Sequence, residues 1–251
     1  MKIVKRIVCI ALTLSMAQAV SMSSYVSAGT TVSAATTTST TTSTTTAKTT
    51  KITLSKTTAK LVQGKTITLK ATVSPNTSAK ITWTSSNKKV VTVDGSGKVK
   101  AVGKGTANVT AKTSDGKSAV CTISVITQNE AYVEEVIRLV NSERTKRGIS
   151  KLAVNSRLSV AAQKRAVETE RKLSHTRPNG TSFSTILEDY KIKYNVTGEN
   201  IAYNYYTASE AMEGLMDSKG HRDNILNKKF KNIGVGLYEK DGYKYLVQLF
   251  T

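Results

Sequence analysis

Asn232-Ile233-Gly234-Val235-Gly236-Leu237-Tyr238 is followed by Asp241-Gly242 and then by Tyr243-Lys244-Tyr245-Leu246-Val247-Gln248-Leu249-Phe250. Both long runs are rich in β-branched, aromatic and other apolar residues, which favour strands. An Asp-Gly pair between two such runs is typical of a tight turn. The stretch therefore predicts an antiparallel hairpin, and with it the sheet of the second half of the chain.

Three helices are predicted before this hairpin. Thr127 and Glu130 have the spacing of a capping box, and Thr207 and Glu210 repeat it, so a helix should begin at each pair. Another helix should begin after Asn155, where small and apolar residues recur at helical spacing and would let another element approach closely. Helices combined with an antiparallel sheet indicate an α+β domain.

The chain has only two histidines, and both lie in this half. Their segments are Ser174–Gly180 and Gly220–Leu226, and Gly198-Glu199-Asn200 lies between them. Imidazole titrates near neutral pH and is the commonest metal ligand in proteins. His175, His221 and Glu199 are therefore the candidate site residues.

Six pieces of the second half of the chain follow one another in a characteristic order: Val140–Arg144, Leu158–Ala162, Ser174–Gly180, Gly198–Ala202, Ser218–Leu226 and Val247–Phe250. With these pieces, residues 130–251 resemble the bacterial branch of the CAP superfamily, which groups cysteine-rich secretory proteins, antigen 5 and plant pathogenesis-related proteins. The resemblance implies an α-β-α sandwich with a central antiparallel sheet and a cleft lined by two histidines and acidic residues.

By this resemblance, His175 and His221 are the cleft histidines and Glu199 is their acidic companion. Animal and plant members have a second cleft glutamate, three residues after a helix tryptophan. Here Leu215 stands at the tryptophan position and Ser218 at the glutamate position. The resemblance therefore implies a cleft that lacks its second carboxylate.

Three interpretations of His175, Glu199 and His221 stay open. They bind a divalent metal such as zinc, or a histidine acts as general base in a metal-assisted hydrolase, with water, Ser174 or Ser218 as nucleophile. In the third, the three side chains only tie loops together, Glu199 by accepting backbone N–H groups. The missing carboxylate favours binding over catalysis.

Residues 51–126 consist of short alternating runs rich in Val, Ile and Thr, separated by turn residues, which predicts an all-β sandwich. One strand is expected over Thr66–Val73, and Trp83 and Cys121 are expected in the core. Five pieces follow in order: Val62–Lys65, Trp83–Asn87, Val90–Val93, Gly97–Ala101 and Gly103–Ala107. Through these pieces the segment resembles bacterial immunoglobulin-like domains of group 2, which implies a surface spacer or adhesion module.

Residues 1–28 have the features of an export signal, with a basic start and an uncharged apolar run over Ile7–Ala17. A run of about 11 residues is too short to span a bilayer, so no transmembrane segment is expected in the mature chain. Residues 29–50 are mostly Thr, Ser and Ala and indicate a linker. Removal of the signal leaves Cys121 as the only cysteine, so no intramolecular disulfide is expected.

The net charge of +20 is concentrated in the first domain. Residues 51–126 contain 13 lysines, no arginine and only Asp94 and Asp115, which gives 13 − 2 = +11, against 20 − 15 = +5 for residues 127–251. Nucleic-acid readers use arginine and several aromatic rings, so no nucleic acid is expected. The lysines suit an anionic cell-wall polymer, or they only keep exposed strands soluble.

Tyrosines gather in the sequence between the two histidine segments. They are expected either to line a groove for an apolar or sugar ligand or to pack in the core. With the cleft, they leave a lipid, a glycan or a peptide open as the ligand. The tyrosines are Tyr190, Tyr194, Tyr203, Tyr205 and Tyr206.

These observations predict two domains: an immunoglobulin-like sandwich over residues 51–126 and a CAP domain over residues 127–251. The expected function is that of a secreted, surface-associated bacterial protein, extracellular or bound to the cell wall. In it, the first domain is a spacer that contacts anionic wall, and the CAP domain is a binding module. The alternative is a metal-assisted hydrolase acting on wall or extracellular substrates.

Overall fold

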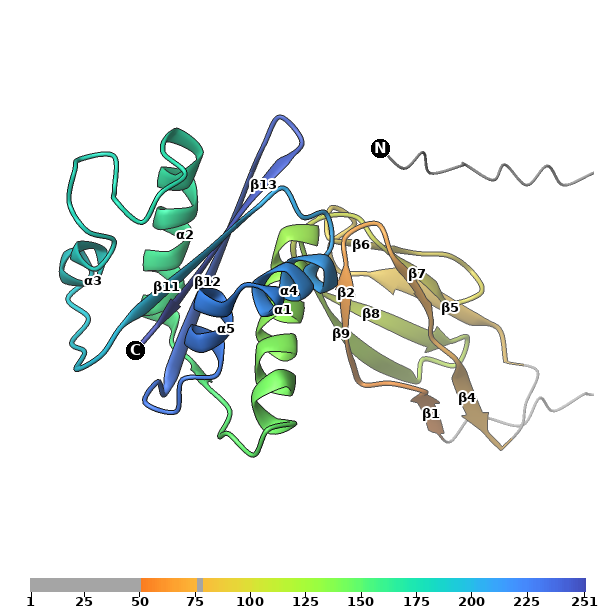
Figure 1. The fold of residues 1–251 in the computed structure, drawn as a ribbon. Helices are drawn as coiled ribbons and strands as arrows, with labels where there is room; N and C mark the ends of the chain where they lie inside the picture. Colours follow the sequence, from red (N-terminus) through yellow and green to blue (C-terminus); the bar gives the residue numbers. More distant parts are fainter. Residues whose placement is uncertain (1–50, 76–78) are drawn as a thin grey trace, which may run out of the picture. The chain divides into compact units, whose positions relative to one another are not determined.

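The computed structural model describes residues 51–75 and 79–251 (Figure 1). The predicted signal, residues 1–28, and the predicted linker, residues 29–50, lie outside the described residues. Within the described ranges, no helix combines the length and the apolar character needed to cross a membrane.

The regular elements among the described residues of the first domain are all strands. Its sheets have the strand orders β2-β9-β8-β5, β3-β7-β6 and β1-β4. Alternate residues of β8 and β9 form the core, where Val109, Cys121 and Ile123 are fully buried and Trp83 packs against them. The strands are β1 (Lys51–Leu54), β2 (Thr58–Val62), β3 (Thr66–Thr68), β4 (Ala71–Ser74), β5 (Ile81–Ser85), β6 (Val91–Val93), β7 (Lys98–Ala101), β8 (Gly105–Thr113) and β9 (Ser118–Ile126).

The single strand expected over Thr66–Val73 is wrong. The chain leaves β3 at Leu69, whose side chain is buried and whose N–H donates to the carbonyl of Gly97 at 2.9 Å. It then enters β4 and pairs with β1 instead of β7. The break moves the chain from one sheet of the sandwich to another, which an alternating pattern alone does not reveal.

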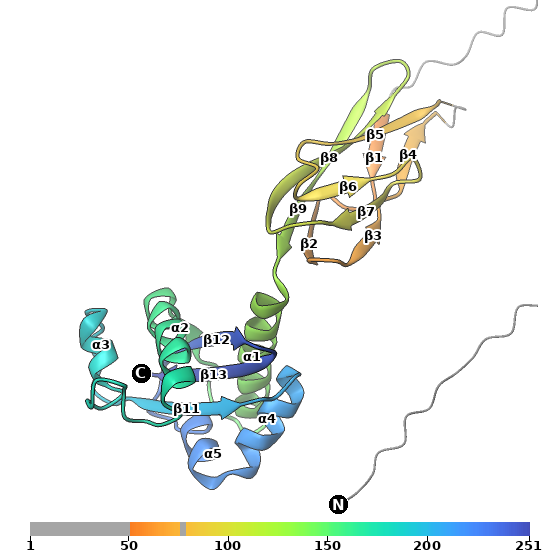
Figure 2. The same ribbon diagram turned by 90° about the horizontal axis from the view of Figure 1, so that it is seen from above.

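The second domain has three layers (Figure 2). Its sheet has the order β10-β12-β13-β11; helices α2 and α3 pack on one face, and α1, α4 and α5 pack on the other. The elements are α1 (Gln128–Thr145), β10 (Ala153–Val154), α2 (Ser156–Arg171), α3 (Thr185–Asp189), β11 (Gly198–Tyr203), α4 (Ala208–Asp217), α5 (Lys219–Ile225), β12 (Asn232–Lys240) and β13 (Tyr243–Phe250).

The predicted hairpin is confirmed as β12 and β13, which pair antiparallel up to Lys240 and Tyr243. Asp241 and Gly242 make the turn with φ values of 53° and 81°. Positive φ at both central residues matches the twist of a hairpin, and glycine adopts it without a steric penalty. The hairpin places β13 in the middle of the sheet, where it also pairs with β11.

The predicted helix starts are confirmed. Thr127 and Thr207 both form complete capping boxes, with Glu130 and Glu210 returning hydrogen bonds to the cap residues. Asn155 accepts the N–H of Leu158 at 3.0 Å and begins α2. Because these bonds satisfy N–H groups that have no partner in the first helical turn, each start is fixed locally by the sequence.

Helix α2 lies unusually close to β12. A Cβ atom added at Gly234 would lie 2.3 Å from the carbonyl carbon of Leu158, and one at Gly236 would lie 2.3 Å from that of Ala162. These contacts are with helix backbone, which cannot rotate away as a side chain can. Glycine is therefore required on the strand, and the small residues of α2 complete the close approach.

Gly234→Ala should destabilise the second domain by ~1–3 kcal/mol, because its methyl group overpacks the contact with α2. Urea unfolding followed by tyrosine fluorescence measures this, since every tyrosine of the described residues lies in the second domain and Trp83 reports on the first. Gly220→Ala is the matched control, because its Cβ would meet nothing within 4 Å. Equal losses in the two variants would contradict the close-packing argument.

Candidate functional site

The structure brings His175 and Glu199 together. His175 lies in the loop after α2, and Glu199 is the second residue of β11. Nδ1 of His175 lies 2.9 Å from Oε1 of Glu199. The glutamate side chain is fully buried, whereas 58% of the histidine side chain is exposed. Because Nδ1 is hydrogen-bonded to Glu199, the ring nitrogen that can contact a ligand is Nε2.

Arg165 of α2 holds Glu199 from the other side. Its guanidinium donates through Nε to Oε2 at 2.8 Å and through Nη2 to Oε1 at 3.2 Å, with both side chains fully buried. Nη2 also donates to the carbonyl of Ser174 at 3.0 Å. This bidentate pair joins α2, β11 and the loop that carries His175.

A second charged pair fixes the same loop. Arg177 donates to Glu168 through Nε at 3.1 Å and through Nη2 at 2.9 Å, and its Nη1 lies 2.9 Å from Asp189. Glu168 also accepts from Arg165 at 3.0 Å. Glu168 thus accepts from two guanidinium groups, and Glu199 accepts from that of Arg165, where the loop-tying interpretation expected backbone N–H groups.

His221 is the third residue of α5 and is half-buried. Its backbone carbonyl accepts from Nδ2 of Asn200 at 3.1 Å, and Asn200 also donates to Gln248 at 3.0 Å. Nδ2 of Asn224 donates to Oδ1 of Asn200 at 2.9 Å. These buried amide groups position α5, and His221 with it, against β11.

His175 and His221 line one small cleft of about 170 Å³, together with Leu173, Ser174, Ile201 and Tyr203. Ser174, one of the two candidate nucleophile serines, is thus a lining residue, whereas Ser218, the other one and the counterpart of the missing glutamate, is not. Ser218 lies between α4 and α5, ending one helix and preceding the other. The structure therefore places two imidazoles on one cleft and joins one of them, that of His175, to a buried carboxylate.

The two histidines have opposite electrostatic surroundings. The hydrogen bond to Glu199 is the main cause that raises the pKa of His175. Burial, and secondly the charge of His175, lower the pKa of His221. At one pH near neutrality, His175 thus favours the charged form and His221 the neutral form.

The three candidates are donors of the right kind for zinc, but their arrangement does not fit a three-ligand site. Both oxygens of Glu199 accept hydrogen bonds from Arg165, and Oε1 also contacts His175. In the described part of the chain, no three His, Cys, Asp or Glu side chains form a group able to hold a metal ion. Metal binding through the two imidazoles stays a prediction.

The five tyrosines expected near the cleft are dispersed. Tyr203 lines the cleft, Tyr190 lines a different cavity, and Tyr205 packs against the core beside α1 and α4. Tyr194 and Tyr206 are exposed. The five therefore do not line one groove.

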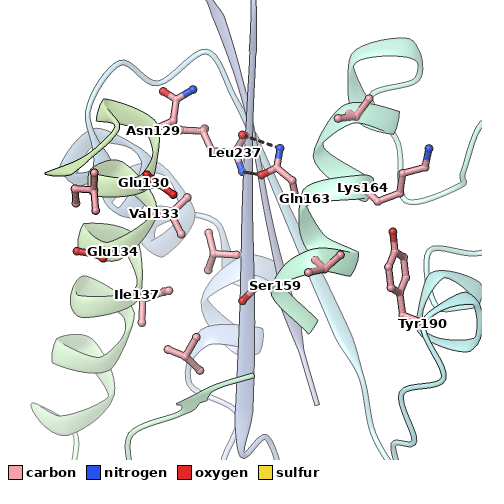
Figure 3. A pocket seen from close by; sticks show the side chains of 15 residues that line it. Asn129, Glu130, Val133, Glu134, Ile137, Ser159, Gln163, Lys164, Tyr190 and Leu237 are labelled. Carbon is pink, nitrogen blue, oxygen red and sulfur yellow. Dashed lines mark hydrogen bonds between the residues drawn. The ribbon is translucent and has the colours of Figure 1, made fainter. Parts of the chain in front are cut away.

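A larger cavity of about 720 Å³ lies between α1, β12 and α2 (Figure 3). Its walls are mostly apolar and include Val133, Ile137 and Val160. Gln163 crosses it and exchanges two hydrogen bonds with the backbone of Leu237, at 3.0 and 3.1 Å. The cavity shares no lining residue with the histidine cleft.

Sequence reasoning missed Arg165. A signal for it exists, because Arg165 lies four residues after Ala161 and three after Ala162, on the buried stripe of α2. A charged residue among small apolar residues at helical spacing requires a buried partner of opposite charge. Glu199, already singled out, is that partner.

Arg165→Ala should destabilise the second domain by ~3–5 kcal/mol, because it leaves the Glu199 carboxylate buried without its partner. Urea unfolding followed by tyrosine fluorescence gives this value. Arg138→Ala is the control, since Arg138 forms an exposed pair with Glu135 and should change stability by less than ~1 kcal/mol. A small effect of Arg165→Ala would show that the pair does not anchor the site.

The opposite pKa shifts predict opposite pH dependence. The raised pKa of His175 means that its contribution to stability is complete below its unfolded pKa of about 6.5 and is lost as pH rises through the folded pKa. The lowered pKa of His221 means that its contribution is complete above about 6.5 and is lost as pH falls.

The unfolding free energies of His175→Gln and His221→Gln, each subtracted from that of the unsubstituted chain between about pH 5 and 8.5, measure these contributions. The His175 difference should fall with pH and the His221 difference should rise. Other titrating groups cancel in the subtraction. Two differences of the same slope would contradict the assigned surroundings.

Comparison with known proteins gives two matches along the chain. Residues 137–250 match the cysteine-rich secretory protein family, CAP, and residues 48–123 match the bacterial Ig-like domain of group 2. The Bacillus subtilis protein YkwD is 36% identical over 120 residues, which are 47% of this chain and 47% of YkwD. The membrane protein YlbC of the same bacterium is 31% identical over 109 residues, 43% of this chain and 32% of YlbC.

The chain thus spans about half the length of YkwD and about a third of that of YlbC. A solved extracellular protein with an SCP domain from Bacillus anthracis is similar with a TM-score of 0.46 and 24% identity, over 52% of this chain and 45% of that one. The two family matches agree with the two folds described above. The chain therefore consists of a bacterial immunoglobulin-like domain of group 2 followed by a domain of the CAP, or cysteine-rich secretory protein, family.

Proposed function

We propose that this protein is secreted and surface-associated, and that its CAP domain is a binding module presented by a lysine-rich immunoglobulin-like spacer. One observation carries the proposal for the cleft: Glu199 is fully buried and held by Arg165 on one side and by His175 on the other. The buried carboxylate thus stabilises the cleft by holding His175, one of the residues that line it.

This arrangement supports recognition better than hydrolysis. The alternative, a metal-assisted hydrolase, needs ligands that are free to hold the metal ion and its bound water. Glu199 is already neutralised by a guanidinium, and Ser218 does not line the cleft. The polar groups that the cleft presents to a ligand are two imidazoles, whose pKa values are shifted in opposite directions, and a serine hydroxyl. These groups are suited to hydrogen bonding.

The first domain supplies the charge for contact with the wall. All 13 of its lysines are exposed, and they are spread over several strands and turns. Lysine carries a compact hydrated charge, which suits diffuse attraction to a polyanion. The basic, apolar start of the sequence supports export, and the Thr/Ser-rich stretch after it suits a tether.

The test is sedimentation of the full chain with purified Bacillus subtilis cell walls at about 0.05 and 0.5 M salt, where screening differs strongly. At low salt, loss of four lysines from the first domain should weaken binding by about tenfold or more, and the same loss from the second domain should have a much smaller effect. The test variant replaces Lys98, Lys100, Lys112 and Lys117 by Gln; the control replaces Lys164, Lys193, Lys228 and Lys229 by Gln.

Binding that persists at high salt should depend on the cleft and should be lost in His221→Ala. Equal effects of the two four-lysine variants would contradict the role of the first domain. High-salt binding that is unchanged in His221→Ala would contradict the role of the cleft. The two halves of the proposal are thereby tested separately.

A further inference from the structure

A row of tyrosines, two exposed and two partly buried, continues from the histidine cleft. Tyr203, Tyr245 and Tyr238 occupy paired positions across β11, β13 and β12. The ring of Tyr203 lies 5.0 Å from that of Tyr245 and 5.9 Å from that of Tyr243, measured between centroids. Tyr245 lies 6.3 Å from Tyr238. We call these four residues the tyrosine ladder.

The outer part of the ladder faces solvent. Tyr203 is 39% exposed and Tyr243 is 45% exposed, and their rings are nearly parallel, at 17°. Large aromatic side chains gain most by burial, so a stacked and exposed pair is a surface on which a ligand can gain contact area. Tyr203 belongs both to this surface and to the lining of the cleft.

The size of the cleft limits the kind of ligand. Its volume of about 170 Å³ is below the ~300–1,000 Å³ of sites that enclose a whole small ligand. The cleft therefore admits about one ring, and a larger ligand has to continue outside it. The aromatic surface that begins at Tyr203 is the adjoining place for the next units of a chain.

The chemistry of the ladder favours a sugar chain. Flat aromatic faces contact the C–H faces of pyranose rings, while the phenol, imidazole and serine groups can bond their hydroxyls. A phenol is protonated at neutral pH, so the hydroxyl of Tyr203 is a donor; burial and the neighbouring tyrosines raise its pKa further. An acyl chain would leave these polar groups without partners, which is costly.

The charges near the ladder argue against a phosphate polymer. Lys240, at the hairpin turn on the ladder's face of the sheet, is paired with Glu170 at 2.5 Å, whereas Lys244 lies on the opposite face beside Tyr132. Single-stranded nucleic acid also stacks on aromatic rings, but its binding needs cations along the backbone path. A surface on which the lysine charge is neutralised by a carboxylate suits an uncharged polymer better than a phosphate polymer.

We propose that the cleft and the tyrosine ladder together bind a linear, uncharged chain of pyranose sugars. The terminal sugar enters the cleft between His175 and His221, and the next sugars stack on Tyr203 and Tyr243. This inference rests on the proposed function of the cleft as a binding site, and it adds the class of ligand and the direction in which the ligand leaves the cleft.

The test uses the full chain and a β-1,4-linked hexasaccharide of N-acetylglucosamine as the probe, with calorimetric titration. Tyr243→Ala should weaken hexasaccharide binding by about tenfold, the loss of one aromatic contact. Tyr194→Ala is the matched control, because Tyr194 is 37% exposed and lies outside the ladder; its affinity should be unchanged. The disaccharide should bind more weakly and be insensitive to Tyr243→Ala.

Hexasaccharide binding that is equally affected by both tyrosine variants would overturn the inference. So would tighter binding of an oligothymidylate that depends on Tyr243, since it would make nucleic acid the ligand. If the hexasaccharide does not bind while high-salt wall binding still requires His221, the sugar class is wrong and the binding function stands. If wall binding does not depend on the cleft either, the proposed function fails together with the inference.

Discussion

The buried ion pair between Arg165 and Glu199 is the interaction on which the site depends. Two charged side chains that are fully buried are stable only when they pair with each other. The Arg165–Glu199 pair therefore fixes the distance between α2 and β11. The same guanidinium holds the carbonyl of Ser174, and the same carboxylate holds the ring of His175. One contact therefore positions the helix, the strand and the loop, and the strand and the loop line the cleft.

Most of the fold could be predicted from local signals. The Asp241-Gly242 turn and the capping boxes at Thr127 and Thr207 specify their elements through bonds made within a few residues, and all three are confirmed. The break at Leu69 could not be read in the same way. It depends on a hydrogen bond to Gly97, 28 positions away, and on the presence of a second sheet.

In the candidate site, too, the residues with a local signal could be predicted, and those whose role depends on a distant partner could not. His175, His221 and Glu199 stand out as residue types and by family resemblance, and the structure brings them together. Arg165 was missed because its role depends on a partner in another element. The five tyrosines that lie close together in sequence do not gather in space, and the ladder takes Tyr238, Tyr243 and Tyr245 from the hairpin.

The contact of Gln163 with Leu237 has a consequence beyond local stability. Strand β10 pairs only with the first two residues of β12, so the rest of that strand lies at the edge of the sheet. The carboxamide of Gln163 has the donor and acceptor of a peptide group and satisfies Leu237 as a neighbouring strand would. A strand of another polypeptide can pair with β12 at Leu237 only after it displaces the Gln163 side chain. Gln163 therefore opposes edge-to-edge pairing, which leads β-rich proteins to self-associate and aggregate.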